Sequence, residues 1–357
     1  MSDASSVKSR ISENVRFISP YSVPRIECSV KLDGNESPYD LEGEEKLALS
    51  KRLAALPVNR YPDPEALELK TSLSRAVGFP GDGILLGNGS DEIIQMIVEV
   101  LGGKSGCVLV PSPTFSMYKI TSLILGKQVT EVALDESFDI DLEPTLEIIS
   151  AEDPDIVFLA TPNNPTGNSF SEEKVLQILE ASAGAVVLDE AYCDFSKKSY
   201  IPHIEKYENL LVLRTMSKIG FAGARLGMLF ARPRIASEVN KARLPYNINS
   251  LSQMVMSFAL ENSEVIEGRV SLILSERERL CDALGRIEAI HAYPTDANFF
   301  LVRVPDAEFL FAELVKNDIL VRRFEGGGRL ADCLRITVGT RDENDRLIEA
   351  LVGIFSS

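Results

Sequence analysis

Four short runs of almost wholly apolar residues lie in the middle of the chain, and they restrict the fold more than any other feature. Each run is bounded by proline, glycine or polar residues. The runs are Cys107–Pro113, Asp155–Pro162, Ala185–Tyr192 and Asn209–Thr215. A strand with one buried face alternates apolar and polar residues, whereas a strand buried on both faces is apolar throughout. The runs therefore predict strands of a parallel sheet that is covered on both sides.

Amphipathic stretches separate these runs. Asp91–Gly103 and Ser171–Ser182 carry apolar residues at helical spacing. Strands that alternate with helices in this way form an α/β layer, in which helices flank a mostly parallel central sheet. We expect this layer to form a large domain over residues 57–262.

The sequence pattern changes after about Asn249. A nearly continuous helical stretch runs to Ile287, and two β-like runs follow it, Ala297–Val304 and Cys333–Gly339. This order predicts a long connecting helix that leads into a smaller α+β domain, and the chain has no internal repeats. The opening segment up to Leu56 has no helix–strand rhythm, and we expect it to pack on the second domain. The expected divisions are an N-terminal arm over 1–30 and a small domain made of 31–56 with 263–357.

Charge excludes several classes of partner. The 357 residues include 53 acidic and 37 basic side chains, which gives a formal net charge of −16. Nucleic acids and anionic membranes are polyanions, so neither is an expected partner. A small substrate remains compatible, since a local basic pocket can exist on an acidic protein.

Several features of the sequence bear on the expected location of the protein. The N-terminus, MSDASSVKSRISENVRF, lacks the apolar core of a signal peptide, and no apolar run reaches the ~18 residues of a membrane-spanning helix. The cysteines are odd in number and never spaced as CxxC, which favours a reduced, cytoplasmic location without disulfides. With two histidines in the chain, no metal site is expected.

Polar side chains follow the ends of three predicted strands. TPNNPTG follows the second apolar run, DEAY closes the third, and TMSK follows the fourth. Ligands of open α/β sheets bind outside the carboxyl ends of the strands. Taken alone, Asn164 could simply form a turn and Asp189 could cap a helix. Their convergence with Tyr192 and Lys218 at one edge of the sheet favours a functional site.

Two further features indicate a bound phosphate group. GNGSDE (residues 87–92) places two glycines and Ser90 directly before a predicted helix. The free N–H groups and the dipole of a helix N-terminus attract anions, although glycine-rich turns before helices are common. Ser217 and Arg225, on either side of Lys218, would add a hydroxyl and a guanidinium for the same dianion.

Taken together, these motifs resemble a known family. LDGNESP, NRYPDP, GNGSDE, PTF, TPNNPTG, DEAY, SK followed by GAR, and LRITVG are similar, in order and spacing, to fold-type I pyridoxal-phosphate aminotransferases of the histidinol-phosphate aminotransferase family. The resemblance runs from about Tyr21 to Val352. It implies a large domain with a mostly parallel sheet, a smaller α+β domain, and pyridoxal 5′-phosphate as cofactor.

The resemblance assigns roles to the residues at the strand ends. Lys218 would bond to the cofactor's aldehyde and move the proton at the substrate's Cα, and apolar surroundings would favour its neutral amine. A surface lysine whose stem lies on apolar neighbours is the alternative. Asp189 would pair with the pyridinium nitrogen, and Asn164 and Tyr192 would hydrogen-bond the phenolic oxygen.

Other positions would hold the remainder of the cofactor. Ser90 and Asp91, mainly through backbone N–H groups, would join Ser217 and Arg225 around the phosphate. Phe115 would stack on the ring, at a position where close relatives often carry tyrosine. Tyr61 in NRYPDP would reach the phosphate of a partner subunit, which implies a homodimer with shared active sites. Without the resemblance, Tyr61 could equally anchor a proline-rich turn.

Substrate-binding residues are also implied by the resemblance. Arg335 matches the arginine that receives a substrate carboxylate, and a guanidinium fork suits carboxylate and phosphate alike. Arg322 matches a second anion-binding position, with adjacent Arg323 as a competitor. The positions that match the lining of the substrate pocket are Tyr21, Asn35 and Asn298. Either asparagine could instead satisfy loop backbone.

The activity implied is transamination between L-histidinol phosphate and 2-oxoglutarate in histidine biosynthesis, giving imidazole acetol phosphate and L-glutamate. An aromatic aminotransferase or a threonine-phosphate decarboxylase would use the same lysine and phosphate site, and a non-catalytic regulator would keep the scaffold alone. One departure is visible: Lys218 and Arg225 are seven positions apart, where the commonest form of the family has eight. IGFAG must therefore bring Arg225 to the phosphate by a tighter path.

Overall fold

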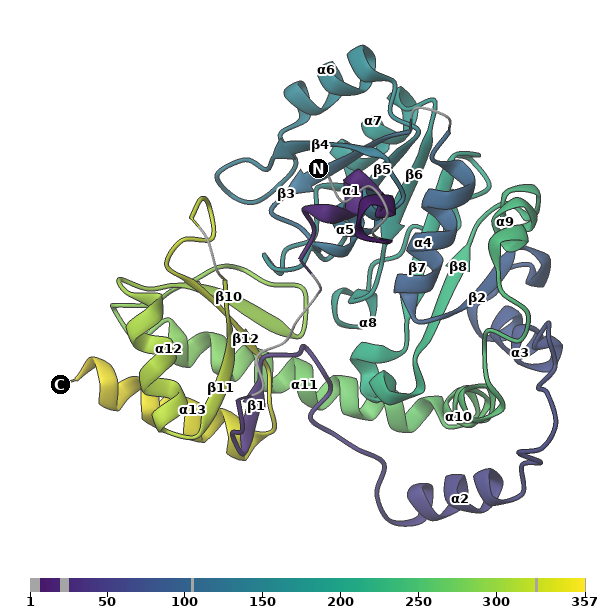
Figure 1. Ribbon diagram of the computed structural model, residues 1–357. Helices are drawn as coiled ribbons and strands as arrows, with labels where there is room; N and C mark the ends of the chain where they lie inside the picture. The colour runs from purple at the N-terminus through teal and green to yellow at the C-terminus, as the bar shows by residue number, and fades with distance from the viewer. Residues whose placement is uncertain (1–6, 20–25, 104–105, 325–326, 357) are drawn as a thin grey trace.

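The computed structural model describes residues 7–19, 26–103, 106–324 and 327–356. Its strands form a seven-stranded sheet and a five-stranded sheet (Figure 1). In spatial order, the seven-stranded sheet contains β2 (Ile84–Asn88), β8 (Leu226–Phe230), β7 (Leu210–Thr215), β6 (Ala185–Asp189), β5 (Ile156–Ala160), β3 (Cys107–Ser112) and β4 (Gln128–Ala133).

The strands β3 to β7 are parallel to one another, and β8 runs antiparallel to its neighbours β2 and β7. The predicted α/β class with a mostly parallel sheet is therefore confirmed. All four apolar runs form strands of this sheet, with ends within three residues of the prediction. The third strand stops at Asp189 rather than Tyr192, so the EAY portion of DEAY lies outside the sheet.

Helices cover both faces of the seven-stranded sheet. They are α3 (Leu67–Val77), α4 (Ser90–Leu101), α5 (Met117–Ile124), α6 (Leu142–Glu152), α7 (Glu172–Ala181) and α9 (Pro233–Val239). Successive residues of a strand point to opposite faces. Accordingly, Val108 and Val110 pack in one core with Ile97 of α4, whereas Leu109 packs in the other core with Ile178 of α7. This arrangement explains why the strands are apolar throughout.

The five-stranded sheet holds, in spatial order, β1 (Val30–Leu32), β11 (Ile319–Arg323), β12 (Cys333–Thr337), β10 (Phe299–Arg303) and β9 (His291–Ala292). Two helices belong to this part of the chain, α12 (Ala307–Lys316) and α13 (Arg341–Phe355). Thr340 begins α13 with a capping box, in which its side chain and that of Glu343 each accept a hydrogen bond from the other's backbone N–H. The expected α+β pattern after the connecting helix is thus observed.

The connection between the sheets consists of two helices, α10 (Ser250–Glu261) and α11 (Ser263–Leu284). We expected a nearly continuous helix, and the structure breaks it at Asn262. This residue has φ −115° and ψ 36°, outside helical values, and its side-chain amide donates to the Phe258 carbonyl at 2.8 Å. In Figure 1, α11 runs beneath both sheets and joins the two parts of the molecule.

The opening segment divides between the two sheets. β1 pairs with β11 as expected, whereas the short helix α1 (Glu13–Arg16) lies against α5 of the larger layer. The Asn14 side chain donates there to the carbonyls of Leu123 and Ile124, at 2.8 and 2.7 Å. The expectation that this whole segment packs on the second domain is therefore wrong for α1. A further helix that the sequence reading missed, α2 (Gly43–Ala54), contacts α10. The domain boundaries remain a prediction.

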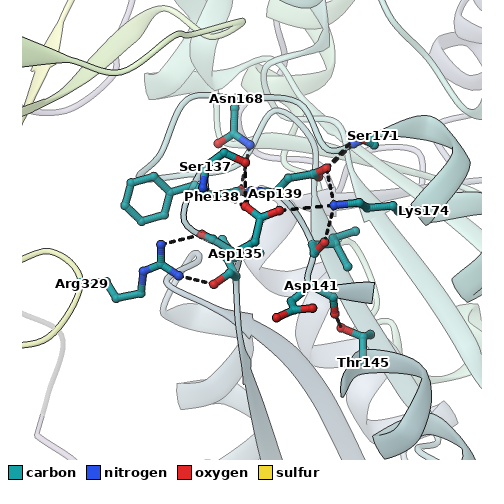
Figure 2. Close-up of polar contacts among 12 residues, drawn as sticks. Asp135, Ser137, Phe138, Asp139, Asp141, Thr145, Asn168, Ser171, Lys174 and Arg329 are labelled. Carbon is teal, nitrogen blue, oxygen red and sulfur yellow. Dashed lines mark hydrogen bonds and ion pairs between the residues drawn. The ribbon is translucent and has the colours of Figure 1, made fainter. Parts of the chain in front are cut away.

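A second contact between the two parts involves the loop from β4 to α6, residues 134–141. Arg329, from the β11–β12 connection, donates to the Leu134 carbonyl and, at 2.5 Å, to the Asp135 carbonyl, and its guanidinium lies 4.8 Å from the centre of the Phe138 ring (Figure 2). On the far side of the loop, Lys174 of α7 pairs with Asp139 at 2.9 Å. The loop is thus held from both sides.

Two general features follow from the described residues. Helices both long and apolar enough to cross a membrane are not found among them. All five cysteines have free thiols: Cys28, Cys107, Cys193, Cys281 and Cys333.

The packing of the sheet makes a stability prediction. Leu229 is fully buried in β8, whereas Leu272 on α11 is 52% exposed. We expect Leu229→Ala to lower the free energy of unfolding of the apoprotein by about 2–5 kcal/mol, because it leaves a cavity between close-packed strands. Leu272→Ala is the matched control and should change it by about 0.5 kcal/mol or less. Chemical denaturation measures both, and equal losses would contradict the assigned core.

Candidate active site

Three neighbouring parallel strands end together and bring the predicted residues to one edge of the larger sheet. Asp189 is the last residue of β6, Lys218 follows β7, and Asn164 follows β5. Tyr192 lies three residues beyond Asp189 in the turn before α8 (Cys193–Ser196). The structure thus brings together the four side chains that the strand pattern predicted at one edge.

Asp189 is a buried carboxylate, 4% exposed. Its Oδ2 accepts a hydrogen bond from the Tyr118 hydroxyl at 2.7 Å, and its Oδ1 accepts one from the Ala191 amide at 3.0 Å. Burial raises the pKa of Asp189 to about 6, and these two donors and the Lys218 ammonium oppose that rise. Within the described residues, no cation lies within ion-pair distance of this carboxylate.

The next residue, Glu190, shows what a buried carboxylate with a protein partner looks like. Glu190 is 1% exposed and accepts two hydrogen bonds from Arg214, at 2.9 and 2.8 Å. A buried charge is costly unless it is paired. Because Glu190 is neutralised within the protein and Asp189 is not, Asp189 is suited to meet a cationic group of a ligand.

Tyr118 is a residue that the sequence reading missed. It is fully buried on α5, with its ring stacked on Phe158 at 4.7 Å between centroids. Burial and the neighbouring Asp189 raise the pKa of Tyr118 well above its usual value, so it remains a donor to that carboxylate. Phe115, half-buried, meets the Tyr118 ring edge-on at 5.5 Å. The sequence signal available was that Tyr118 follows Phe115 by three positions, in the first turn of α5.

Lys218 lies where the two sheets approach each other. Its Nζ is 3.4 Å from the Gly34 carbonyl, just beyond β1, and 5.7 Å from the centre of the Tyr192 ring. Asn35, the next residue after Gly34, donates from Nδ2 to the Tyr192 hydroxyl oxygen at 2.9 Å. The amine therefore lies between residues of both sheets.

The N-terminus of α4 forms a backbone cradle. Gly89 has φ 82°, a conformation that favours glycine, and no side chain caps the helix that begins at Ser90. A Cβ atom on Gly227 of β8 would lie 2.5 Å from the Ser90 nitrogen. Two glycines thus let the backbone come close at a helix end whose N–H groups favour an anion.

Arg225 reaches this cradle despite the shorter spacing from Lys218. The chain between them turns irregularly, with Gly220 at φ 108°, and Arg225 itself adopts φ 51°. The Arg225 guanidinium lies 3.0 Å from the Asp91 carboxylate, at the start of α4. The predicted tighter path therefore brings Arg225 to the helix end, where the Asp91 side chain pairs with it.

Ser217 lies on the opposite side of the lysine, buried, with its Oγ 2.9 Å from the Thr215 Oγ. The Ser217 backbone N–H also donates to the Thr215 Oγ at 3.2 Å. Thr215 therefore fixes both the main chain and the hydroxyl of Ser217 at the end of β7.

Asn164 and Arg335 meet across the two sheets. Arg335 of β12 donates to the Asn164 Oδ1 at 2.7 Å and to the Asp33 carbonyl at 2.5 Å. The adjacent Asn163 is fully buried and holds the loop, since its side chain bonds to Thr114, Thr166 and the Pro113 carbonyl. Only the second asparagine of TPNNPTG thus faces the small sheet.

Arg322 and Arg323 are consecutive residues of β11, so their side chains point to opposite faces of the five-stranded sheet. Arg322 is the direct cross-strand partner of Arg335, so both side chains extend from the same face of the five-stranded sheet. Arg323 points to the other face, where it pairs with Glu308 at 3.3 Å and lies 5.6 Å from the Phe311 ring. Like charges directly opposite each other destabilise a sheet. An anionic ligand would remove that repulsion.

The remaining predicted residues lie in different places. Asn298 is fully buried, donates to the Asn35 carbonyl at 3.2 Å, and has an Oδ1 atom without a hydrogen-bond partner. Tyr61 is 81% exposed and stacks on Tyr246 at 4.5 Å between ring centroids. Tyr21 lies outside the described residues.

These features fit an aromatic cation that carries a phosphate group. The cradle at α4, Ser217 and Arg225 suits a dianion, and the unpaired buried carboxylate suits a ring cation. Lys218 supplies an amine between them, and Phe115 supplies an aromatic surface. The backbone N–H groups, the carboxylate, the amine and the aromatic ring of this chain together match the groups of such a ligand.

Comparison with known proteins identifies the family. The family described as aminotransferase class I and II matches residues 29–351. The chain belongs to this aminotransferase family. A relative in Nitrosococcus oceani, named histidinol-phosphate aminotransferase 2, is 45% identical over 345 residues and covers 96% of each chain.

Solved structures of aminotransferases agree with the architecture. The histidinol-phosphate aminotransferase of Clostridium acetobutylicum superimposes with a TM-score of 0.83 at 27% identity, over 92% of this chain and 99% of that one. A histidinol-phosphate aminotransferase of Sinorhizobium meliloti, in complex with pyridoxal-5′-phosphate, gives a TM-score of 0.88 at 24% identity over 98% of each. The second match, at its lower identity, bears on the fold alone.

The glycine cradle of this aminotransferase can be tested directly. We expect Gly227→Ala to weaken binding of pyridoxal phosphate to the apoprotein by about tenfold or more (about 1.4 kcal/mol), because the new methyl group displaces the start of α4. Binding of unphosphorylated pyridoxal should change far less. Gly268→Ala on α11, where a Cβ atom meets nothing within 4 Å, is the control. Equal losses for both ligands would show that the cradle does not bind phosphate.

Proposed function

We propose that this aminotransferase transfers an amino group between L-histidinol phosphate and 2-oxoglutarate, giving imidazole acetol phosphate and L-glutamate, with pyridoxal 5′-phosphate as cofactor. The observation that carries the proposal is the site itself: a phosphate cradle, a buried unpaired carboxylate and a lysine at adjacent strand ends, facing two arginines of the second sheet. Relatives named histidinol-phosphate aminotransferase, 39–45% identical over nearly the whole chain, support this substrate.

The residues would divide the cofactor between them. The backbone of Ser90 and Asp91, with Ser217 and Arg225, would bind the phosphate. Asp189 would accept a hydrogen bond from the ring nitrogen and keep it protonated. The others would bind the face and phenolic oxygen of the ring: Phe115, Asn164 and Tyr192. When bound, the cofactor supplies an electron-withdrawing ring that stabilises the electrons left when the substrate's Cα loses its proton.

Lys218 would perform the proton transfer. A neutral Nζ can take the proton from the substrate's Cα and return one on the cofactor side, and positioned general bases of this kind contribute about 10²–10⁴ in rate. Its contacts to Gly34 and Tyr192 keep the amine at the junction of the two sheets. Both cofactor and substrate would therefore be within its reach.

Arg322 and Arg335 would bind the acidic groups of the substrates. Neither a lysine nor a neutral side chain presents the planar fork that matches phosphate and carboxylate geometry. A phosphate dianion carries enough negative charge for both guanidinium groups, and a dicarboxylate such as 2-oxoglutarate can occupy the same pair. Asn298, with its free buried oxygen, would accept a hydrogen bond from the substrate.

A homodimer with shared active sites belongs to the same proposal. The exposed Tyr61, stacked on Tyr246, would reach the phosphate bound by the partner subunit. The reduced, cytoplasmic location expected from the cysteines remains a prediction.

A paired turnover assay tests the substrate. We expect the holoenzyme to aminate 2-oxoglutarate from histidinol phosphate with a kcat/KM at least about a hundredfold above that for phenylalanine, since a site built for an anionic group is left with unpaired charge by an analogue that lacks it. Carbon dioxide release from threonine phosphate is followed in parallel. Preference for phenylalanine, or decarboxylation, would replace the proposal by one of the activities that share this scaffold.

Replacement of Lys218 tests its proposed roles in covalent attachment of the cofactor and in proton transfer. Lys218→Ala should bind pyridoxal phosphate without covalent attachment and lose turnover by about a hundredfold or more, because the general base is gone. Borohydride reduction followed by mass spectrometry measures the attachment. The exposed Lys316, which pairs with Glu313 one helical turn away, provides the control variant Lys316→Ala. Labelling that persists in Lys218→Ala would assign the reaction to another lysine.

The two neighbouring arginines of β11 form a matched pair for the substrate site. Arg322→Met should raise the KM for histidinol phosphate about tenfold or more, since hydrogen bonds to charged groups contribute about 1.5–3 kcal/mol. Arg323→Met, on the opposite face, should change it by about twofold or less. Steady-state kinetics of both variants measures this difference, and a larger effect at Arg323 would reverse the assignment.

A further inference from the structure

Tyr192 and Asn35 form a hydrogen bond that joins the two sheets deep inside the molecule. The Asn35 Nδ2 donates to the Tyr192 hydroxyl oxygen at 2.9 Å, and the two residues are 1% and 4% exposed. Asn35 follows β1 of the five-stranded sheet, whereas Tyr192 follows β6 of the seven-stranded sheet. The bond lies beside Lys218, whose Nζ is 5.7 Å from the Tyr192 ring.

The orientation of the Asn35 amide is fixed by Thr337. The Thr337 hydroxyl accepts the Asn35 backbone N–H at 3.0 Å, and donates its own hydrogen to the Asn35 Oδ1 at 3.2 Å. Thr337 is 3% exposed, so its hydroxyl hydrogen needs an acceptor within the protein. With Oδ1 occupied in this way, the NH₂ group of Asn35 must face Tyr192.

This arrangement determines the direction of the Tyr192 hydroxyl. A tyrosine hydroxyl can donate one hydrogen bond and accept others. Because its oxygen accepts from Asn35, its hydrogen remains available to a different acceptor, and no such acceptor is found among the described residues. The hydroxyl is therefore a buried donor directed away from Asn35, at the edge of the site.

The backbone of Asn35 explains the choice of residue. Asn35 has φ 51°, and the Asn298 side chain holds its carbonyl at 3.2 Å. Asparagine and aspartate are among the few residues enriched in this left-handed region. Of the two, only asparagine has the N–H group that Tyr192 requires.

We infer that Asn35 is a positioning residue that directs the Tyr192 hydroxyl hydrogen toward the phenolic oxygen of the bound cofactor. The inference rests on the proposed function, because that function places the cofactor's oxygen beside Tyr192. It changes the role of Asn35 from lining the substrate pocket to orienting a cofactor donor. The direction of the Tyr192 hydroxyl then depends on the five-stranded sheet, since Asn35, Thr337 and Asn298 lie in or next to strands of that sheet.

The test measures the pH midpoint of the visible absorbance of the lysine-bound cofactor. A donor to the phenolic oxygen stabilises the more negative, deprotonated form, so its loss raises the midpoint. Tyr192→Phe removes the donor and should raise the midpoint by about one unit or more, as expected for hydrogen bonds to charged oxygens. Asn35→Gly, which fits φ 51° without strain, should raise it by about half a unit to one unit.

The decisive comparison is the double variant. In a Tyr192→Phe background, Asn35→Gly should produce no further shift, because Asn35 acts through the missing hydroxyl. Thr337→Val, which releases the amide, should shift the midpoint in the same direction in the native background only. Asn317→Gly at the end of α12 serves as the control. Turnover should show a several-fold lower kcat for Asn35→Gly with a KM that changes by about twofold or less.

The possible outcomes distinguish a failure of the inference about Asn35 from a failure of the proposed function. A shift from Asn35→Gly that persists in the Tyr192→Phe background, or a rise in KM at unchanged kcat, would overturn the positioning role and return Asn35 to the substrate pocket. No shift from Tyr192→Phe itself would remove both the role of Tyr192 and the inference. A wild-type protein that binds no pyridoxal phosphate would contradict the proposed function. Chemical denaturation of each apoprotein identifies a variant that is merely unfolded, and Thr337→Val then provides the test.

Discussion

The rest of the site depends on one buried carboxylate that the protein does not neutralise. Asp189 lies at the end of β6 with a pKa raised by burial to about 6, held by Tyr118 and the Ala191 amide. Its neighbour Glu190, just beyond the end of β6, accepts hydrogen bonds from Arg214. The two adjacent acids therefore have different surroundings, because a cationic side chain reaches only the second of them among the described residues. One carboxylate is satisfied internally, and the other is left for a cationic ligand group.

The Asp189 carboxylate forms part of a binding site because the neighbouring strands end close to it. β5, β6 and β7 are parallel neighbours, so the turns that carry Asn164, Asp189 and Lys218 converge without any long excursion of the chain. The five-stranded sheet then closes the site through direct hydrogen bonds, from Arg335 to Asn164 and from Asn35 to Tyr192. The geometry of the residues proposed to bind the cofactor is thus coupled to the position of the five-stranded sheet.

The sequence allowed four strands of the larger sheet, and the polar side chains at the ends of three of them, to be predicted for a physical reason. Strands buried on both faces leave an unmistakable apolar pattern, and polar residues at their ends are conspicuous against it. The break at Asn262 was missed because amphipathic spacing continues through it. Tyr118 was missed because its contact with Asp189 joins residues 71 positions apart, and periodicity within one helix does not reveal such a contact. The packing of α1 on α5 depends on side-chain bonds of Asn14, which likewise leave no periodic signal.

The placement of the two arginines proposed to bind substrate depends on strand register, which a sequence motif does not define. Arg322 and Arg323 are equivalent in sequence, and only the pairing of β11 with β12 distinguishes them. A slip of one residue would place Arg323 opposite Arg335 and turn Arg322 toward Glu308, because side chains alternate between faces. The Glu308–Arg323 pair and the Phe311 contact oppose such a slip. The selectivity proposed for an anionic substrate would therefore rest on contacts on the far face of the sheet, which the aminotransferase motifs do not contain.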